Sequence, residues 1–229
     1  MSNLQIAIAA TMAILVIGAG IVLYQGYAVA NDRSGTGSGS VELAAAAATS
    51  GDPYPLSTCP VSGEELGGMG DPVVYDHEGR EIRFCCNGCV GKFKADPAKY
   101  IEKIDAEIVK QHLANYPLDT CVVTDEELGS MGDAMPVVVN NRLFALCCMG
   151  CKKKLSADPA KYFNKLDAAV IKAQTADYPL DTCVVTGEKL GSMGDPVDYV
   201  FENRLVRFCC KGCIGKFEAD PLKYMAKLN

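Results

Sequence analysis

Hydrophobic and polar residues follow three successive patterns along this chain. An almost continuous apolar run covers 6–23, inside a longer stretch, 4–30, that has no charged residue. A segment rich in Gly, Ser and Ala follows over 31–52. From residue 53 onward, short apolar strings alternate with glycine-containing turns and with apolar residues at helical spacing. We therefore predict an N-terminal membrane-length helix, a flexible linker and a folded C-terminal region.

The N-terminal helix, 1–30, has two interpretations. About 20 residues at about 1.5 Å each cross a bilayer core, so the run is long enough for a membrane anchor. Alternatively, Ala28-Val29-Ala30 has the small-x-small form of a signal-peptide cleavage site. The first residues lack Lys and Arg, so charge does not decide between the two. Either interpretation predicts an extracytoplasmic protein of the periplasm or cell envelope, membrane-anchored or secreted.

The folded region predicts the same small α+β unit three times. In the first copy, apolar 73–75 and 81–84 flank the turn 76–79, which predicts a β-hairpin. A short helix is expected over 87–94, and Asp96-Pro97 then offers an N-cap and a first-turn proline for a second helix. Apolar residues of that second helix keep helical spacing at Tyr100, Ile101, Ile104 and Ile108. Asp158-Pro159 and Asp220-Pro221 repeat the helix start.

Twelve cysteines define the repeat period. A cysteine follows a Tyr-Pro-Leu-x-Thr phrase every 62 residues, and a Cys-Cys-x-Gly-Cys phrase recurs with the same period. These positions divide the chain into repeat one (53–115), repeat two (116–177) and repeat three (178–229), which we expect to be strung closely, like beads. The candidate metal ligands are the four cysteines of each repeat: Cys59, Cys85, Cys86, Cys89, Cys121, Cys147, Cys148, Cys151, Cys183, Cys209, Cys210 and Cys213.

Composition narrows the classes of function. The pI near 5.0 and net charge of −6 argue against a nucleic-acid partner, which calls for a clustered basic face. No Ser/His/Asp set, paired carboxylates or phosphate-binding loop recurs in the repeats, so we do not expect an enzyme. Units of about 60 residues without Trp bury little surface on folding. A stabilising cross-link is therefore expected in each unit, either disulfides or a metal site.

The spacing of the cysteines favours a metal site. One cysteine in a turn with others at the start of a distant helix is the layout of a treble-clef site, and a helix N-terminus favours thiolates. The residue three after the first cysteine is Ser62, Thr124 or Thr186, so the usual C-x-x-C knuckle is incomplete. The site therefore has three or four thiolates. Three sulfurs in an open or low-coordinate geometry suit Cu(I) and other soft ions, and tetrahedral Zn(II) is the alternative, with about one ion per repeat.

Other residue types recur less clearly. Histidine is not a repeated ligand, because Val139 and Phe201 stand at the positions equivalent to His77, and Gln174 at that of His112. Both histidines are therefore expected at the surface.

Three further sets of residues, of other types, recur in register in the repeats. The methionines are either soft ligands or, more commonly, buried gap-fillers. The arginines either offset thiolate charge or are solvated, and the glutamates form solvated turns. These sets are Met69, Met131 and Met193; Arg80, Arg142 and Arg204; and Glu64-Glu65, Glu126-Glu127 and Glu188.

The phrases Tyr-Pro-Leu-x-Thr-Cys-Pro-Val-Ser-Gly, Phe-Cys-Cys-x-Gly-Cys and Lys-Phe-x-Ala-Asp-Pro-x-Lys-Tyr resemble YHS/TRASH-type domains. The resemblance covers 54–229 and recurs three times. It implies a treble-clef-like fold linked to trafficking, resistance and sensing of heavy metals. It also implies coordination by Cys59, Cys85 and Cys89 and their equivalents. The gap from Cys59 to Cys85 is longer than usual in the family, which leaves open whether Cys85 or Cys86 is the main ligand.

Three classes of function follow from these observations. The leading expectation is a non-enzymatic envelope protein that binds copper or a similar thiophilic ion for sequestration, buffering or delivery. Its partners would be metal ions, a metal donor or acceptor protein, and the membrane if the N-terminal helix is uncleaved. The alternatives are zinc-stabilised interaction modules and a disulfide or thiol-redox protein. Repeat two is expected to bind with altered affinity, because Asp133-Ala134-Met135-Pro136, Ala145-Leu146 and Leu155 depart from the other copies.

Overall fold

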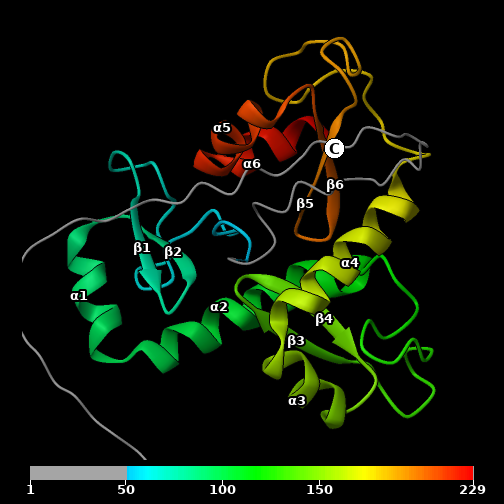
Figure 1. The fold of residues 1–229 in the computed structure, drawn as a ribbon. Helices are drawn as coiled ribbons and strands as arrows, with labels where there is room; N and C mark the ends of the chain where they lie inside the picture. The colour runs from blue at the N-terminus through cyan, green and yellow to red at the C-terminus, as the bar shows by residue number, and fades with distance from the viewer. Residues whose placement is uncertain (1–50, 229) are drawn as a thin grey trace, which may run out of the picture. The chain divides into compact units, whose positions relative to one another are not determined.

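The computed structural model describes residues 51–228 (Figure 1). The chain divides into two units, 1–40 and 41–229, and every described residue belongs to the second unit. The anchor or signal helix and all of the linker except its last two residues lie outside the described residues. Among residues 51–228, no helix has the length and apolar character needed to cross a bilayer.

Each repeat contains one antiparallel β-hairpin. The pairs are β1 (Val73–His77) with β2 (Arg80–Phe84), β3 (Met135–Val139) with β4 (Arg142–Leu146), and β5 (Val197–Phe201) with β6 (Arg204–Phe208). The described sheets are these three two-stranded ribbons. The predicted hairpin is confirmed, with longer strands and a tighter turn than expected. In β1–β2 the turn is Glu78-Gly79, and both residues have positive φ, as a two-residue type I′ turn requires.

Two helices follow each hairpin. They are α1 (Asn87–Ala95) and α2 (Pro97–His112), then α3 (Met149–Ala157) and α4 (Pro159–Gln174), then α5 (Ile214–Ala219) and α6 (Pro221–Met225). Short 3₁₀ turns cover Leu113–Asn115, Lys211–Cys213 and Ala226–Leu228. Asp96 and Asp158 cap α2 and α4 by accepting the backbone N–H three residues on, as predicted. Asp220 also precedes a first-turn proline, but its side chain makes no cap hydrogen bond.

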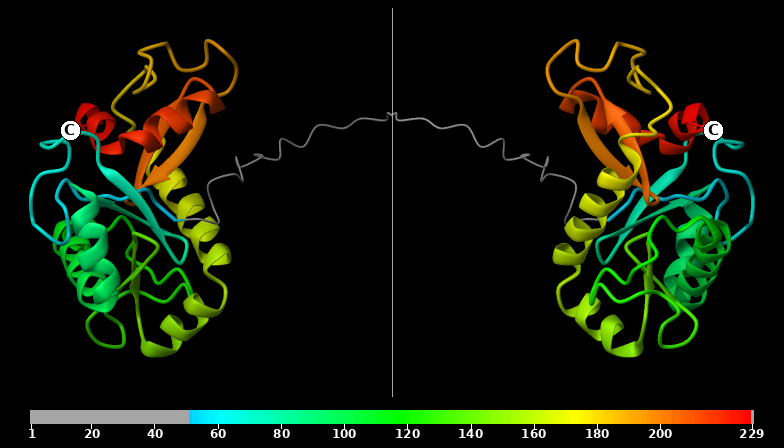
Figure 2. Two further views of the ribbon diagram at one scale, coloured as in Figure 1. Left: turned by 90° about the vertical axis from the view of Figure 1, so that its left-hand side faces the viewer. Right: turned by 90° about the vertical axis from the view of Figure 1, so that its right-hand side faces the viewer.

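Each repeat has a hydrophobic core between its hairpin and its helices. Leu143 of repeat two also belongs to the core of repeat one, and Val200 of repeat three to the core of repeat two. In repeat one, Phe84 and Phe93 are fully buried with ring centroids 5.4 Å apart, and Phe208 and Phe217 pair in the same way at 5.5 Å. Figure 2 shows the β5–β6 hairpin beside α5 and α6 in both views. Leu146 and Leu155 fill the equivalent space in repeat two, and both are fully buried. These substitutions in repeat two therefore change core side chains within the same fold.

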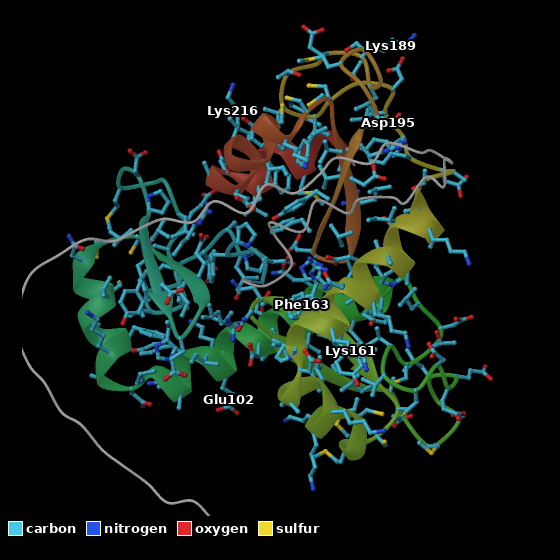
Figure 3. The ribbon with its side chains drawn as sticks, in the orientation of Figure 1. Glu102, Lys161, Phe163, Lys189, Asp195 and Lys216 are labelled. Carbon is cyan, nitrogen blue, oxygen red and sulfur yellow. The ribbon has the colours of Figure 1, made fainter. Side chains whose placement is uncertain are left out.

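The helical spacing predicted for the second helix correctly identifies its buried face. Ile104 and Ile108 of α2 are each 1% exposed. In α4, Phe163 packs edge-on against Phe144 of the hairpin, with ring centroids 5.1 Å apart. Phe163 is 4% exposed, whereas Lys161 of the same helix is exposed; both are labelled in Figure 3. The helices α2 and α4 thus each bury one apolar face against hairpin strands.

The three repeats, expected from the sequence to be strung closely, contact one another directly. Asn141, in the turn of the β3–β4 hairpin, is 1% exposed and donates to the backbone oxygens of Asp52 and Glu81 at 3.0 and 2.8 Å. Asn203, the equivalent turn residue of repeat three, donates to Leu143 O at 2.8 Å. Repeats one and three meet where Arg83 donates to the backbone oxygens of Glu218 and Ala219. The three hairpins therefore form one packed unit.

The in-register arginines take part in this packing. Arg80 pairs with Asp105 at 2.7 Å and donates to Asn141 Oδ1 at 2.7 Å. Arg142 is 3% exposed and pairs with Asp52 and Asp167. The interpretation as solvated arginines is therefore wrong for these two residues, which are buried and paired with carboxylates. Arg204 donates to Leu228 O at 3.0 Å.

Candidate metal centre

Local structure brings one cysteine from a turn together with cysteines at a helix start. Cys59 lies in a tight turn in which its N–H bonds Glu64 O at 2.8 Å and its oxygen accepts from Gly63 N at 2.8 Å. Cys85 follows the end of β2, Cys86 is the N-cap residue of α1, and Cys89 lies in the first turn of that helix. The same turn and helix start recur around Cys121 and Cys151, and around Cys183 and Cys213.

Three sulfur atoms of each repeat lie within 4.8 Å of one another. The triads are Cys59, Cys85 and Cys89; Cys121, Cys147 and Cys151; and Cys183, Cys209 and Cys213. The Sγ atoms of Cys85 and Cys89 are 3.7 Å apart, and the equivalent pairs are separated by 3.5 and 3.8 Å. All nine side chains are buried, with at most 7% exposure. The triads are thus enclosed within the hydrophobic cores.

The fourth cysteine of each repeat lies outside its triad. Cys86 is half-buried, and its Sγ lies 3.8 Å from that of Cys89. Cys148 and Cys210 hold the same position, 3.6 and 3.9 Å from the third triad cysteine. The spacing in the sequence did not decide between Cys85 and Cys86 as the main ligand. The structure places Cys85 in the buried triad and Cys86 at its outer side.

A hydroxyl group contacts each triad at the position where a C-x-x-C knuckle would have its second cysteine. Ser62 Oγ is 3.3 Å from Cys85 Sγ, Thr124 Oγ1 is 3.4 Å from Cys147 Sγ, and Thr186 Oγ1 is 3.5 Å from Cys209 Sγ. By sequence, these residues mark only the absence of the second knuckle cysteine. Their recurrence in register was the signal that they share a structural position. A hydroxyl there can donate a hydrogen bond to a thiolate.

The triad thiols differ in acidity. Burial raises the pKa of Cys59, but hydrogen bonds from the Ser62 hydroxyl and nearby backbone N–H groups outweigh it, and the pKa falls to about 7. The same opposition of burial and hydrogen bonds brings the pKa of Cys121 to about 7 and that of Cys183 to about 6. Burial and neighbouring thiols raise the pKa of Cys89 and of Cys151 to about 12, and the pKa of Cys213 also rises. Each metal-free triad therefore combines an acidic thiol with one that keeps its proton.

The triad geometry fits a thiophilic ion. Sulfur atoms bound at about 2.3 Å to one tetrahedral ion lie about 3.8 Å apart, and a trigonal ion separates them slightly more. The sulfur separations of 3.5–3.8 Å between the second and third triad cysteines match this spacing. Each triad is thus positioned to hold one metal ion, or three ions in the described region.

Other predicted residues lie in different surroundings. Met69, Met131 and Met193 are 62–66% exposed, so they do not fill core gaps as expected. His77 packs edge-on against Phe93, and His112 Nε2 lies 3.0 Å from Glu202 Oε1, so neither histidine is fully at the surface. The glutamates 64, 65, 126, 127 and 188 are exposed, as predicted for solvated turns.

No match to this chain was found among protein-family models, curated proteins or solved structures.

Proposed function

We propose that this chain is a non-enzymatic metal-binding protein of the cell envelope, related to YHS/TRASH-type domains. Each repeat holds one thiophilic ion, Cu(I) in preference to Zn(II), for sequestration, buffering or delivery. The observation that carries the proposal is the buried sulfur triad, built three times with the same geometry. Soft thiolates in a three-sulfur set suit Cu(I).

The surroundings of the triads support metal binding in two ways. The first triad cysteine of each repeat has a lowered pKa, because hydrogen bonds from a nearby hydroxyl and from backbone N–H groups outweigh the effect of burial. The second triad cysteine of each repeat also contacts a hydroxyl, which can donate a hydrogen bond to this sulfur when it is a thiolate. Both features stabilise negative charge on sulfur before an ion arrives. Packing of the repeats into one unit keeps three such sites close together, which raises the local capacity for ions.

One observation favours a second function, in which zinc only stabilises the fold. The triad cysteines are members of the hydrophobic cores, with Cys59 and Cys121 fully buried. An ion bound there links a turn, a strand end and a helix, and structural zinc contributes about 10–16 kcal/mol to folding in small fingers. Under this alternative the ions do not exchange.

An anaerobic titration of the full chain in mild detergent separates these functions. Cu(I) and Zn(II) are added against chromophoric competitors, and free thiols are counted before and after. Three exchangeable Cu(I) ions with protected thiols are expected. Three Zn(II) ions that Cu(I) does not displace, with unfolding on their removal, would establish the structural role. A chain with no free thiols and no bound metal would contradict both and favour disulfides.

Matched variants locate the ions. Replacing Cys59, Cys121 and Cys183 by Ser removes one sulfur from each triad and is expected to abolish tight binding. Replacing the exposed Met69, Met131 and Met193 by Ala removes three other sulfurs in register and is expected to leave all three ions bound. Loss of binding in the methionine variant alone would move the sites to the exposed loops.

A further inference from the structure

Each buried triad has one additional sulfur on its outer side. Cys86, Cys148 and Cys210 are half-buried, whereas the nine triad cysteines are at most 7% exposed. The backbone at these three positions is the same, extended with φ between −160 and −164°. Each of the three repeats therefore has a partly accessible thiol beside its buried cysteine triad.

The sulfur of the outer thiol lies close enough to the third triad sulfur for both to bind one ion. Its Sγ lies 3.8, 3.6 or 3.9 Å from the third triad sulfur in the three repeats. These separations match those within the triads, so an ion bound by Cys89 can also bond Cys86 without movement of the helix. The outer sulfur is nevertheless not part of the set whose members all lie within 4.8 Å of one another. It can hold an ion together with Cys89 without completing the buried site.

A glycine leaves one flank of the outer sulfur open. A Cβ added at Gly88 would lie 3.7 Å from Cys86 Sγ, and Gly150 and Gly212 have the same relation to Cys148 and Cys210, at 3.6 and 3.8 Å. Any side chain at these exposed positions would therefore cover the sulfur. Because all three repeats have glycine there, another molecule can approach each outer thiol from solvent.

We propose that Cys86, Cys148 and Cys210 are the transfer thiols through which ions pass between the triads and a thiol-bearing acceptor or donor. This inference rests on the proposed function. In the transfer step, the ion forms a bond to Cys86 Sγ while one triad bond breaks. The proton lost by Cys86 is balanced by one gained by the released triad sulfur. Thiolates of the acceptor then replace Cys86 and the remaining triad sulfurs one bond at a time. Each released sulfur takes up the proton that an acceptor thiol loses, and the ion keeps its oxidation state throughout.

Equilibrium and kinetic measurements on the full chain test this role. The wild type and a Cys86→Ser/Cys148→Ser/Cys210→Ser variant are loaded with Cu(I), and release to glutathione is followed with a chromophoric Cu(I) chelator. The variant is expected to retain three ions with affinity within about threefold of wild type, because the triads remain. Its release rate is expected to fall at least about tenfold. An unchanged rate would overturn the proposal, and so would a loss of affinity or stoichiometry, which would make Cys86 an equilibrium ligand.

A second variant keeps every sulfur atom. Gly88→Ala/Gly150→Ala/Gly212→Ala covers the open flank of the outer thiol, and alanine is well tolerated in helices. Slower release with unchanged affinity is expected, and a wild-type rate would contradict access from this side. If the wild type itself binds no ion, the proposed function fails and the transfer role fails with it. If the wild type binds three ions but both variants release them at its rate, only the transfer role fails.

Discussion

Arg142 Nε lies 2.6 Å from Asp52 Oδ2, which joins two side chains 90 residues apart. Both side chains are almost fully buried, with exposed fractions of 3% and 2%. Arg142 also donates to Asp167 in its own repeat and to Val200 O in repeat three. Asp52 Oδ2 accepts from Glu202 N at 3.0 Å as well. One ion pair thus connects the residue before repeat one with repeats two and three.

Removing one partner of this pair should destabilise the packed unit. Asp52→Ala leaves the buried guanidinium of Arg142 with one carboxylate fewer, and breaking a buried pair costs about 3–5 kcal/mol. Urea denaturation of the metal-free, reduced variant should show a lower midpoint than that of the wild type. The single transition expected for the wild type should split into more than one in the variant. Asp133→Ala, at an exposed aspartate, is the matched control and should leave the midpoint unchanged. A wild-type midpoint for Asp52→Ala would show that the repeats are stable independently.

The hydroxyl beside each triad should determine the coordination number. Ser62→Cys places a fourth sulfur where Ser62 Oγ now lies 3.3 Å from Cys85 Sγ, which completes a tetrahedral thiolate set. One of the three Zn(II) ions should then bind at least about tenfold more tightly in a competition titration. Ser62→Ala is the control and should not raise the affinity. Equal Zn(II) binding in wild type and Ser62→Cys would mean that the hydroxyl does not face the ion.

Phe93 should be a principal source of stability in repeat one. Its ring is fully buried and lies 5.4 Å from that of Phe84 and 5.9 Å from that of Tyr75. Phe93→Ala should cost about 3–5 kcal/mol in urea denaturation, because truncation leaves a cavity. Phe93→Leu introduces the residue that repeat two has at this position, and should cost clearly less. Equal losses of stability in the two variants would show that stability does not depend on the side-chain volume at position 93.

Repeat two should differ from its neighbours in metal affinity. Leu146 and Leu155 replace a pair of phenylalanines behind its triad, and its second and third triad sulfurs are 3.5 Å apart, compared with 3.7 and 3.8 Å. Competition titration of the full chain with Cu(I) should therefore resolve two classes of site in a ratio of two to one. Cys121→Ser should remove the single-member class. One affinity for all three ions would contradict this prediction.

Sequence and structure agree best where the information is local. The hairpins, the start of each helix and its buried face follow from alternation, capping residues and helical spacing within about 15 residues. Ile104 and Ile108 were identified as core residues by their spacing alone, and both are buried. The period of the cysteines likewise identified one set of four in each repeat.

The sequence did not predict the burial of Arg80, Arg142, Asn141 and Asn203. Polar residues in a hairpin turn are normally solvated, and only contact with another repeat removes these from water. The opposite holds for Met69, Met131 and Met193. Their apolar side chains predicted burial, but they are 62–66% exposed in their loops. Whether a side chain is buried depends on neighbours that local patterns do not specify.

By itself, the sequence determined three copies of one α+β unit and the four cysteines that each copy contributes. Tertiary structure decided that Cys85 belongs to the buried triad and Cys86 to its outer side, although the two are adjacent in the chain. It also decided that the copies pack together through Asp52 and Arg142. The physical reason is that secondary structure arises from interactions over a few residues. Sulfur geometry and ion pairing instead depend on atoms that folding brings together from 26 to 90 positions apart.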